Sequence, residues 1–281
     1  MKFVSLNGEF IKTGKPIWLA DNRSYRYGDG LFETMKLEKG RITLENYHWE
    51  RLNEGLRLLN IKTPRRWNVD KLREEIIQLC RKNKCEKLAR LRLSVSRGNG
   101  GLYDATKKFQ WLLECWPLTK SVNHLNENGW VIDIYPDARK SYDLFSHLKS
   151  ANFLPYVMAA DYAREHNLND CLVLNTNDRI ADSTIANIFI IRKNQVITPP
   201  LRESCIYGVM RRKILETKFE IEGLPESFSE LPLTENDLEQ ADEVFLTNSI
   251  HGLRWVQRFR DKEYGNELTT KIFNTISQTI S

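Results

Sequence analysis

Segments with helical and with strand periodicity follow one another in this chain without a regular strand–helix–strand alternation. The helical period predicts helices over residues 44–59, 69–82, 152–166, 207–219 and from 268 onward. Alternating or short apolar runs predict strands over 2–6, 9–13, 89–96, 109–116, 130–135, 171–174, 185–191 and 243–247. This irregular mixture favours an α+β fold over a doubly wound parallel sheet.

The chain is long enough for more than one compact part. Its 281 residues suit one large or two modest domains. A polar, turn-rich stretch follows Leu118 and is typical of a linker. We therefore expect a small N-terminal domain over 1–118, a linker over 119–128 and a large domain over 129–281.

Composition and charge argue against several classes of protein. No apolar segment is long enough to span a bilayer, and the N-terminus becomes polar too early for a secretory signal. The five cysteines are odd in number and widely spread, which is typical of reduced thiols in a cytoplasmic protein. Cys80 and Cys85 are close in sequence, but no second pair completes a zinc site, so we expect no metal. The net charge of +5 comes from interleaved basic and acidic residues, so we expect no nucleic-acid or membrane partner.

Two segments of the second half carry the strongest chemical signal. The first is His147-Leu148-Lys149-Ser150-Ala151-Asn152-Phe153-Leu154, in which a lysine precedes an amphipathic helix. Its apolar neighbours would lower the pKa of the lysine by disfavouring the ammonium form. By itself, such a lysine is more often a surface residue at the start of a helix. The second segment is Arg179-Ile180-Ala181-Asp182-Ser183-Thr184-Ile185-Ala186-Asn187-Ile188-Phe189.

Together the two segments resemble the core of the class IV (fold type IV) pyridoxal-phosphate enzymes. These include branched-chain and D-amino acid aminotransferases and aminodeoxychorismate lyase. The resemblance implies an α+β fold with a small N-terminal α/β domain and a larger, barrel-like C-terminal domain with helices. It also implies pyridoxal 5'-phosphate as cofactor, a homodimer and a cytoplasmic location. Lys149 would bind the cofactor aldehyde, and Asp182 would face the pyridine nitrogen, where the family has a glutamate.

Three further segments resemble the family's phosphate-binding motifs. Tyr47-His48-Trp49-Glu50-Arg51-Leu52 contains the His-x-x-Arg-Leu pattern, so Arg51 is expected on the cofactor phosphate. Ile206-Tyr207-Gly208-Val209-Met210-Arg211 resembles a glycine turn that opens a helix, where the backbone N–H groups of Val209 and Met210 would bind an anion. Val244-Phe245-Leu246-Thr247-Asn248-Ser249 resembles the loop that supplies amides and a hydroxyl. In that loop we expect Asn248 and Ser249 to contact the phosphate, with Thr247 as the alternative hydroxyl.

The substrate side of the site is less sharply defined. Tyr27-Gly28-Asp29-Gly30-Leu31-Phe32-Glu33-Thr34 resembles the family's small-domain motif, so Tyr27 and Glu33 are expected to line the pocket. Leu102 and Asp104 stand where D-amino acid aminotransferases have the arginine and histidine that hold the substrate carboxylate. The sequence proposes Arg97 for that carboxylate, with Arg26, Lys36 and Arg254 as alternatives.

The motifs favour one member of the family over the others. Ser96-Arg97-Gly98-Asn99-Gly100-Gly101 and the short spacing after Lys149 are similar to aminodeoxychorismate lyases. We therefore expect a lyase of folate biosynthesis that converts 4-amino-4-deoxychorismate, a small amino substrate, to p-aminobenzoate and pyruvate. The alternatives are a branched-chain type aminotransferase acting on amino acids and 2-keto acids, or a catalytically silent homologue that keeps the fold.

Overall fold

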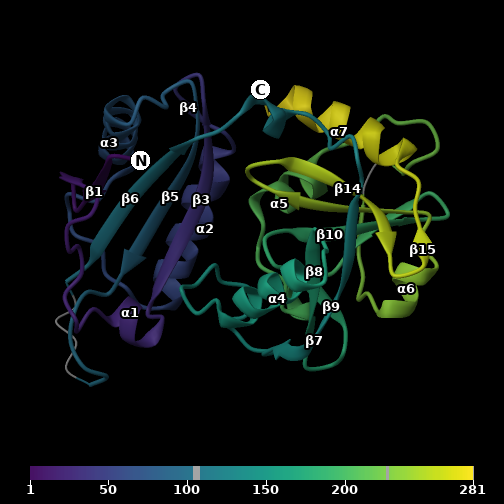
Figure 1. The fold of residues 1–281 in the computed structure, drawn as a ribbon, viewed down its shortest axis with the longest axis horizontal. Coiled ribbons are helices and arrows are strands. Elements are labelled where there is room, and N and C mark those ends of the chain that lie inside the picture. The colour runs from purple at the N-terminus through teal and green to yellow at the C-terminus, as the bar shows by residue number, and fades with distance from the viewer. Residues whose placement is uncertain (104–107, 226–227, 281) are drawn as a thin grey trace. The chain divides into compact units, whose positions relative to one another are not determined.

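The computed structural model describes residues 1–103, 108–225 and 228–280. These residues form two compact units (Figure 1). The first contains residues 1–121 together with 148–153, and the second contains 122–147 and 154–281. The predicted domains were two continuous stretches of chain, ending at 118 and beginning at 129. In the structure, the segment 148–153 around Lys149 belongs to the first unit.

The first unit is built on a six-stranded sheet in which every pairing is antiparallel. In sheet order the strands are β2 (Glu9–Lys12), β1 (Phe3–Leu6), β6 (Gln110–Pro117), β5 (Leu88–Ser96), β3 (Gly30–Glu38) and β4 (Arg41–Ile42). The helices are α1 (Arg23–Tyr27), α2 (Glu45–Leu58) and α3 (Val69–Lys82), followed by a short 3₁₀ turn at Lys120–Asn123. The predicted hairpin at Asn7-Gly8 is confirmed, with both residues at positive φ as such a turn requires.

The helices α2 and α3 form where their periodicity predicts them. On α3, Leu72, Ile76 and Leu79 recur on one face and are buried in the core. The side chain of Asn68 caps the start of α3 by accepting a hydrogen bond from the backbone N–H of Lys71. Both helices contribute to one hydrophobic core with the alternate residues of β5 and β6. The opposite face of β5 carries polar residues, among them Arg92.

Strand β3 was not predicted, and it holds the lysine segment in place. Its motif contains two glycines and reads at sequence level as a turn, but the strand runs for 9 residues and is buried almost throughout. The backbone of residues 149–151 pairs with its first residues: Phe32 N–H donates to Lys149 C=O at 2.9 Å, and Ala151 N–H donates to Gly30 C=O at 2.9 Å. The segment is therefore part of the first unit through backbone hydrogen bonds.

The second unit is built on a nine-stranded mixed sheet. Its strands are β7 (Trp130–Lys140), β8 (Asp170–Asn175), β9 (Ile180–Ser183), β10 (Asn187–Arg192), β11 (Gln195–Thr198), β12 (Ser229–Glu230), β13 (Glu243–Asn248), β14 (Gly252–Phe259) and β15 (Lys262–Glu263). Its helices are α4 (Leu154–Glu165), α5 (Val209–Glu216), α6 (Glu235–Glu239) and α7 (Glu267–Thr279), with a short 3₁₀ turn at Leu201–Glu203.

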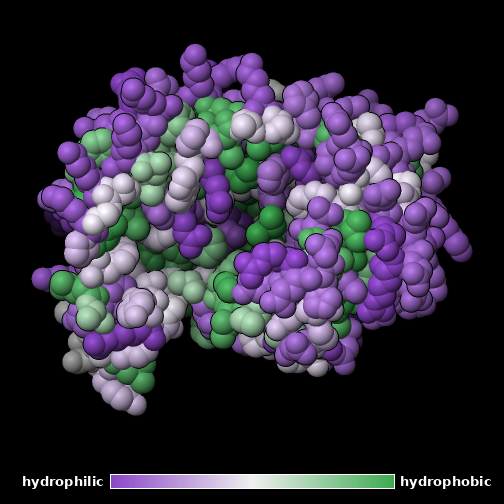
Figure 2. Space-filling model, viewed as in Figure 1, coloured by the Kyte–Doolittle hydropathy of each residue, from purple (hydrophilic) through white to green (hydrophobic). Residues whose placement is uncertain are grey.

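The sheet of the second unit curls back on itself. The strand order is β12-β11-β10-β13-β14-β7-β8-β9, yet β9, at one end, contacts β10 near the other. The inward residues of β8, β10, β13 and β14 form one core. The predicted α+β fold, with a larger barrel-like second part, is confirmed. Among the described residues, no helix combines the length and apolar character needed to cross a membrane. Hydrophilic residues dominate the face seen in Figure 2.

Three of the five cysteines meet in the first unit. The sulfur atoms of Cys80, Cys85 and Cys115 lie within 4.8 Å of one another, and all three residues are buried. Cys80 and Cys85 are five positions apart around the end of α3. Cys115 comes from β6, and no sequence pattern connects it with the other two. All five cysteines are free thiols.

Candidate active site

The ten residues predicted for the site fall into two groups, one in each unit. The first unit holds the predicted catalytic and substrate-side residues, and the second unit holds most of the residues predicted for the cofactor. The first group is Tyr27, Glu33, Arg51, Arg97 and Lys149; the second is Asp182, Val209, Met210, Asn248 and Ser249. Each group is described within its own unit.

Glu33 and Arg51 are joined directly, together with His48. Arg51 on α2 donates to the carboxylate of Glu33 on β3 from Nε at 2.8 Å and from Nη2 at 2.5 Å. Nδ1 of His48 lies 2.6 Å from Oε2 of the same carboxylate and donates to it. Burial by itself would raise the pKa of Glu33, but the charges of Arg51 and His48 lower it to about 2. Glu33 is therefore an ionised anchor that fixes the orientation of Arg51.

His48 was predicted only as part of the motif around Arg51, not as a site residue. It is fully buried, and burial lowers the pKa of its imidazole, an effect that the neighbouring carboxylate of Glu33 only partly offsets. Its Nε2 atom is buried and has no hydrogen-bond partner within the described part of the chain. The three-residue spacing of His48 and Arg51 places both on one face of α2, which is the signal that could have identified it.

Lys149 lies on the edge of β3 against two aromatic rings. Its Nζ is 4.7 Å from the centroid of Phe32 and 5.6 Å from that of Phe153, and the two rings meet edge to face at 5.3 Å. Leu148, the preceding residue, is buried in the core beside Gly55. A Cβ at Gly55 would lie 2.7 Å from Cδ1 of Leu31, so a larger residue there would require the leucine side chain to shift. The amine thus lies against two aromatic rings.

The other two substrate-side residues differ in their surroundings. Tyr27 is exposed, with the guanidinium of Arg23 over its ring. Arg97 donates from Nε to Asp29 at 2.9 Å and from Nη2 to the carbonyl of Leu59 at 2.7 Å. Its donors are therefore engaged in holding the loop before β3 to the end of α2. Asp104 lies outside the described residues.

Asp182 on β9 is the centre of a buried polar network in the second unit. The hydroxyl of Tyr156 on α4 donates to its carboxylate at 2.9 Å, and the backbone N–H of Ile206 donates at 2.8 Å. Nζ of Lys140 on β7 forms an ion pair with the carboxylate at 3.4 Å and a hydrogen bond with Tyr156. Burial raises the pKa of Tyr156, so its hydroxyl stays protonated. Lys140 and Tyr156 were missed because neither lies in a motif.

Replacing Asp182 with alanine is expected to lower the free energy of unfolding by about 3–5 kcal/mol, because Lys140 would keep a buried charge without its partner. Urea unfolding of the cofactor-free protein measures the loss. The double variant Lys140→Met/Asp182→Ala should recover part of it. A double variant that is no more stable than Asp182→Ala would show that the ion pair does not account for the loss.

The start of α5 presents a candidate anion site in the same unit. Val209 and Met210 are its first two residues, so their N–H groups have no partner four residues earlier in the helix. Gly208 precedes them, and a Cβ there would lie 1.8 Å from Oδ1 of Asn187. Asn187 donates from Nδ2 to the carbonyl of Ile206 at 2.8 Å, which holds the turn against β10. Asn187 therefore has a structural role in this turn.

The loop after β13 lies next to this turn through strand pairing. Thr247 pairs with Asn187 between β13 and β10, and its hydroxyl is buried without a hydrogen-bond partner in the described residues. The side chain of Asn248 accepts from the backbone N–H groups of Ile250 and His251, which shapes the turn that follows Ser249. An unpaired buried hydroxyl beside free helix N–H groups fits a phosphate.

Several of these donor types are ones that pyridoxal phosphate requires. The first unit holds an amine against aromatic rings and an oriented arginine. The second unit holds a buried carboxylate and donors suited to a phosphate. These donor types fit a phosphorylated pyridine aldehyde.

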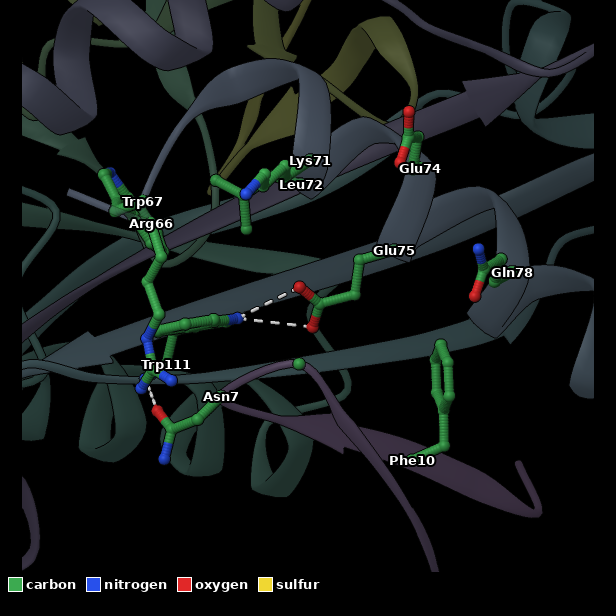
Figure 3. Close-up of a pocket in the computed structure, with 11 residues that line it drawn as sticks. Asn7, Phe10, Arg66, Trp67, Lys71, Leu72, Glu74, Glu75, Gln78 and Trp111 are labelled. Atoms are coloured by element: carbon green, nitrogen blue, oxygen red, sulfur yellow. Dashed lines mark hydrogen bonds between the residues drawn. The ribbon is translucent and has the colours of Figure 1, made fainter. Parts of the chain in front are cut away.

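The structure also has a hollow of about 360 Å³ in the first unit, and none of the predicted site residues lines it. Figure 3 shows Trp111 directing its indole N–H at both carboxylate oxygens of Glu75, each 3.2 Å away. Trp67 and Phe10 complete the aromatic part of the lining. Cζ of Arg66 lies 5.2 Å from the centroid of the Trp111 ring, so the guanidinium of Arg66 covers one face of this ring.

Comparison with known proteins gives a consistent result. The model of the family described as amino-transferase class IV matches residues 30–259. The chain is 29% identical over 236 residues to an aminodeoxychorismate lyase of Vibrio harveyi, which covers 83% of this chain and 83% of the relative.

Two solved structures share the fold. The 4-amino-4-deoxychorismate lyase from Pseudomonas aeruginosa superposes with a TM-score of 0.81 at 26% identity, covering 98% of each chain. The branched-chain amino acid aminotransferase of Escherichia coli superposes with a TM-score of 0.86 at 19% identity, covering 100% of this chain and 94% of the other. At that identity the second comparison shows the fold alone.

Proposed function

The chain belongs to the class IV aminotransferase family, and from this premise we propose that it is an aminodeoxychorismate lyase. It is a pyridoxal-phosphate-dependent enzyme, as members of this family are. The proposed reaction converts 4-amino-4-deoxychorismate to p-aminobenzoate and pyruvate. The likeness to lyases from two organisms over most of the chain carries this proposal.

We assign the cofactor contacts to the residues that the sequence motifs predict. Lys149 would bind the cofactor aldehyde, Asp182 would stand beside the pyridine nitrogen, and Arg51 would contact the phosphate. The backbone N–H groups of Val209 and Met210, with Asn248 and Ser249, would complete the phosphate site. Support comes from the buried carboxylate of Asp182 and from the N–H groups at the start of α5. Tyr156 and Lys140 would hold that carboxylate in place.

Pyridoxal phosphate, when bound, supplies an electron sink for the carbon that bears the substrate nitrogen. Lys149 would take the proton from that carbon. The bond between the ring carbon and the enolpyruvyl oxygen then breaks, and a proton is returned to the departing group, which leaves as pyruvate. The ring becomes aromatic in this step, so the reaction needs no amino acceptor. The rings of Phe32 and Phe153 lie against this amine and would limit where it can point.

The test uses cofactor-loaded protein mixed with 4-amino-4-deoxychorismate and no keto acid. Equal release of p-aminobenzoate and pyruvate is the expected result. An absence of both products from protein that visibly holds its cofactor would contradict the lyase. Amino-group transfer from a branched-chain amino acid to a 2-keto acid would instead establish the second candidate, an aminotransferase, which shares every cofactor contact.

A silent homologue that only keeps the fold is the third candidate. Aspartate in place of the family's glutamate at position 182 is the feature that favours it. The intact Lys149 and the oriented pair of Arg51 and Glu33 favour an active enzyme. We also propose that the protein is a cytoplasmic homodimer, and sedimentation at several protein concentrations tests the oligomeric state.

A further inference from the structure

Three buried thiols meet at the end of α3, and none of them has a role in the proposed active site. Helix α3 packs against β1 and β6 (Figure 1). Cys80 lies on the last turn of α3, Cys85 follows the helix, and Cys115 lies on β6. Their sulfur atoms all lie within 4.8 Å of one another. The sequence does not reveal this group, because the third sulfur comes from a strand 30 positions after Cys85.

The turn that ends α3 brings Cys85 back to Cys80. The backbone N–H of Cys85 donates to the carbonyl of Cys80 at 3.0 Å, and that of Lys84 donates to the carbonyl of Arg81 at 3.1 Å. Lys84 has a positive φ of 57°, so this is a Schellman-type helix end. Such an end places the two residues joined by its longer hydrogen-bonded ring side by side. Local backbone geometry therefore positions the first two sulfurs.

Strand β6 brings the third sulfur to the same point. Cys115 pairs with Leu91 of β5 and belongs to the hydrophobic core of the first unit, as does Leu113 two residues earlier. Nδ2 of Asn83, the residue that caps the end of α3, donates to Sγ of Cys115 at 3.2 Å. This amide gives the sulfur a polar partner outside the group of thiols, as supporting residues do around metal ligands.

The spacing of the three sulfurs suits a shared metal ion. Thiolates bind a metal at about 2.3 Å, so three sulfurs in a plane around one ion lie roughly 4 Å apart. The sulfurs of Cys85 and Cys115 are 3.5 Å apart, and no separation in the group exceeds 4.8 Å, so small side-chain rotations reach this arrangement. A disulfide would engage two of the sulfurs and leave the third aside, whereas one ion engages all three.

The number and softness of the donors favour a monovalent ion over zinc. Structural zinc almost always takes four protein ligands. Among the described residues, no fourth cysteine, histidine or carboxylate belongs to this group. Cys80 and Cys115 are 0% exposed and Cys85 is 4% exposed, which leaves little room for water as a fourth ligand. Soft thiolates select Cu(I), and three sulfurs satisfy this ion without a fourth donor.

The surroundings offset part of the charge of the thiolates and give access to them. The positive amino terminus of the chain lies close enough for its charge to act on Cys115, to which Asn83 also donates. The charge of Glu86 acts in the opposite sense on Cys85. Cys85 lies between two exposed residues, Lys84 and Glu86, so the turn after α3 provides an entry path from solvent.

We propose that Cys80, Cys85 and Cys115 form a binding site for one thiophilic monovalent metal ion, for which Cu(I) is the best match. Three sulfur–metal bonds form, and the displaced thiol protons pass to solvent without any change of oxidation state. The bound ion would join the end of α3 to β6 within the first unit. None of the residues assigned to the cofactor belongs to this site, so the proposal does not depend on the lyase reaction.

The test measures Cu(I) binding to the cofactor-loaded protein under argon, with the coloured chelator bicinchoninate as competitor. Wild-type protein should take one ion per chain from the chelator. Cys115→Ala and Cys85→Ser should each weaken binding by about 100-fold or more, because each removes one of three ligands. X-ray absorption of the copper-loaded wild type should show three sulfur ligands.

Cys171→Ala and Cys205→Ala are the matched controls. Each removes a buried free thiol of the second unit. Neither should change the stoichiometry or the affinity. Circular dichroism and the cofactor absorbance verify that every variant folds and loads. In a second measurement, Cu(I) should raise the urea midpoint of wild type and of both controls, and leave that of Cys115→Ala unchanged.

Four results would overturn the proposal. Wild-type protein that takes no copper from the chelator would refute the site itself. An affinity that is unchanged in Cys115→Ala or in Cys85→Ser would refute the role of that cysteine. Coordination by only two sulfurs would refute the three-ligand site, and tight binding of Zn²⁺ with the same cysteine dependence would refute the choice of ion. The release of p-aminobenzoate is measured separately, so failure of the lyase proposal is distinguishable from each of these results.

Discussion

Replacing Lys149 with alanine is expected to lower turnover by roughly 10⁴-fold or more, because one residue both binds the cofactor and carries the proton. The variant should also lose the covalent bond between protein and cofactor. Borohydride reduction of the loaded protein followed by peptide mass spectrometry measures that bond directly. In wild type the added mass should lie on the peptide that contains Lys149.

The matched control for this prediction is Lys62→Ala, which removes an exposed lysine of the same unit. That variant should keep both the covalent bond and the activity. The finding that would refute the role of Lys149 is cofactor attached by reduction to a different lysine. Lys149→Ala is expected to stay folded, because the backbone hydrogen bond from Phe32 N–H to the carbonyl of residue 149 is kept.

Replacing Glu33 with glutamine is expected to destabilise the first unit strongly. Glu33 is buried, neutralises Arg51 and lies within hydrogen-bond distance of His48, so its replacement leaves a buried guanidinium without its acid. We expect the free energy of unfolding at pH 7 to fall by about 3–5 kcal/mol. Urea unfolding of the cofactor-free protein measures it.

The pH dependence follows from the lowered pKa of Glu33. The pKa of Glu33 is about 2 in the folded protein, compared with 4.5 for a glutamate in the unfolded chain. The folded state therefore binds the proton less readily than the unfolded chain. The charge of Glu33 therefore stabilises the protein above pH 4.5, and this contribution of about 3 kcal/mol is lost as the pH falls from 4.5 towards 2. The stability difference between wild type and Glu33→Gln should narrow over that range.

Glu54→Gln is the control for Glu33, because Glu54 is an exposed residue on α2. It should change the free energy of unfolding by less than about 0.5 kcal/mol. A difference between wild type and Glu33→Gln that stays constant from pH 7 down to pH 3 would contradict the assignment of the lowered pKa to Glu33.

Features determined by local periodicity could be predicted from the sequence. The helix over 69–82 appears with the predicted limits, and the hairpin at Asn7-Gly8 forms with the expected turn. In both cases residues close in sequence decide the structure. The helix follows from its repeating apolar face, and the hairpin follows from the ability of Asn-Gly to adopt positive φ. Strand β3 escaped prediction because both of its faces are covered, which removes the alternation that identifies a strand.

The sequence also indicated which residues carry the chemistry. Lys149, Asp182 and Arg51 stand in motifs whose spacing is characteristic of one family, and the match over residues 30–259 confirms that family. Their roles in the site stay predictions, and Lys149→Ala tests the first of them.

The partners of these residues were decided by the tertiary structure alone. Glu33 and Arg51 are 18 positions apart, and Lys140 and Asp182 are 42 apart, so nothing local links either pair. Motifs record the groups that chemistry needs, but the electrostatic state of each group depends on neighbours that only long-range packing supplies.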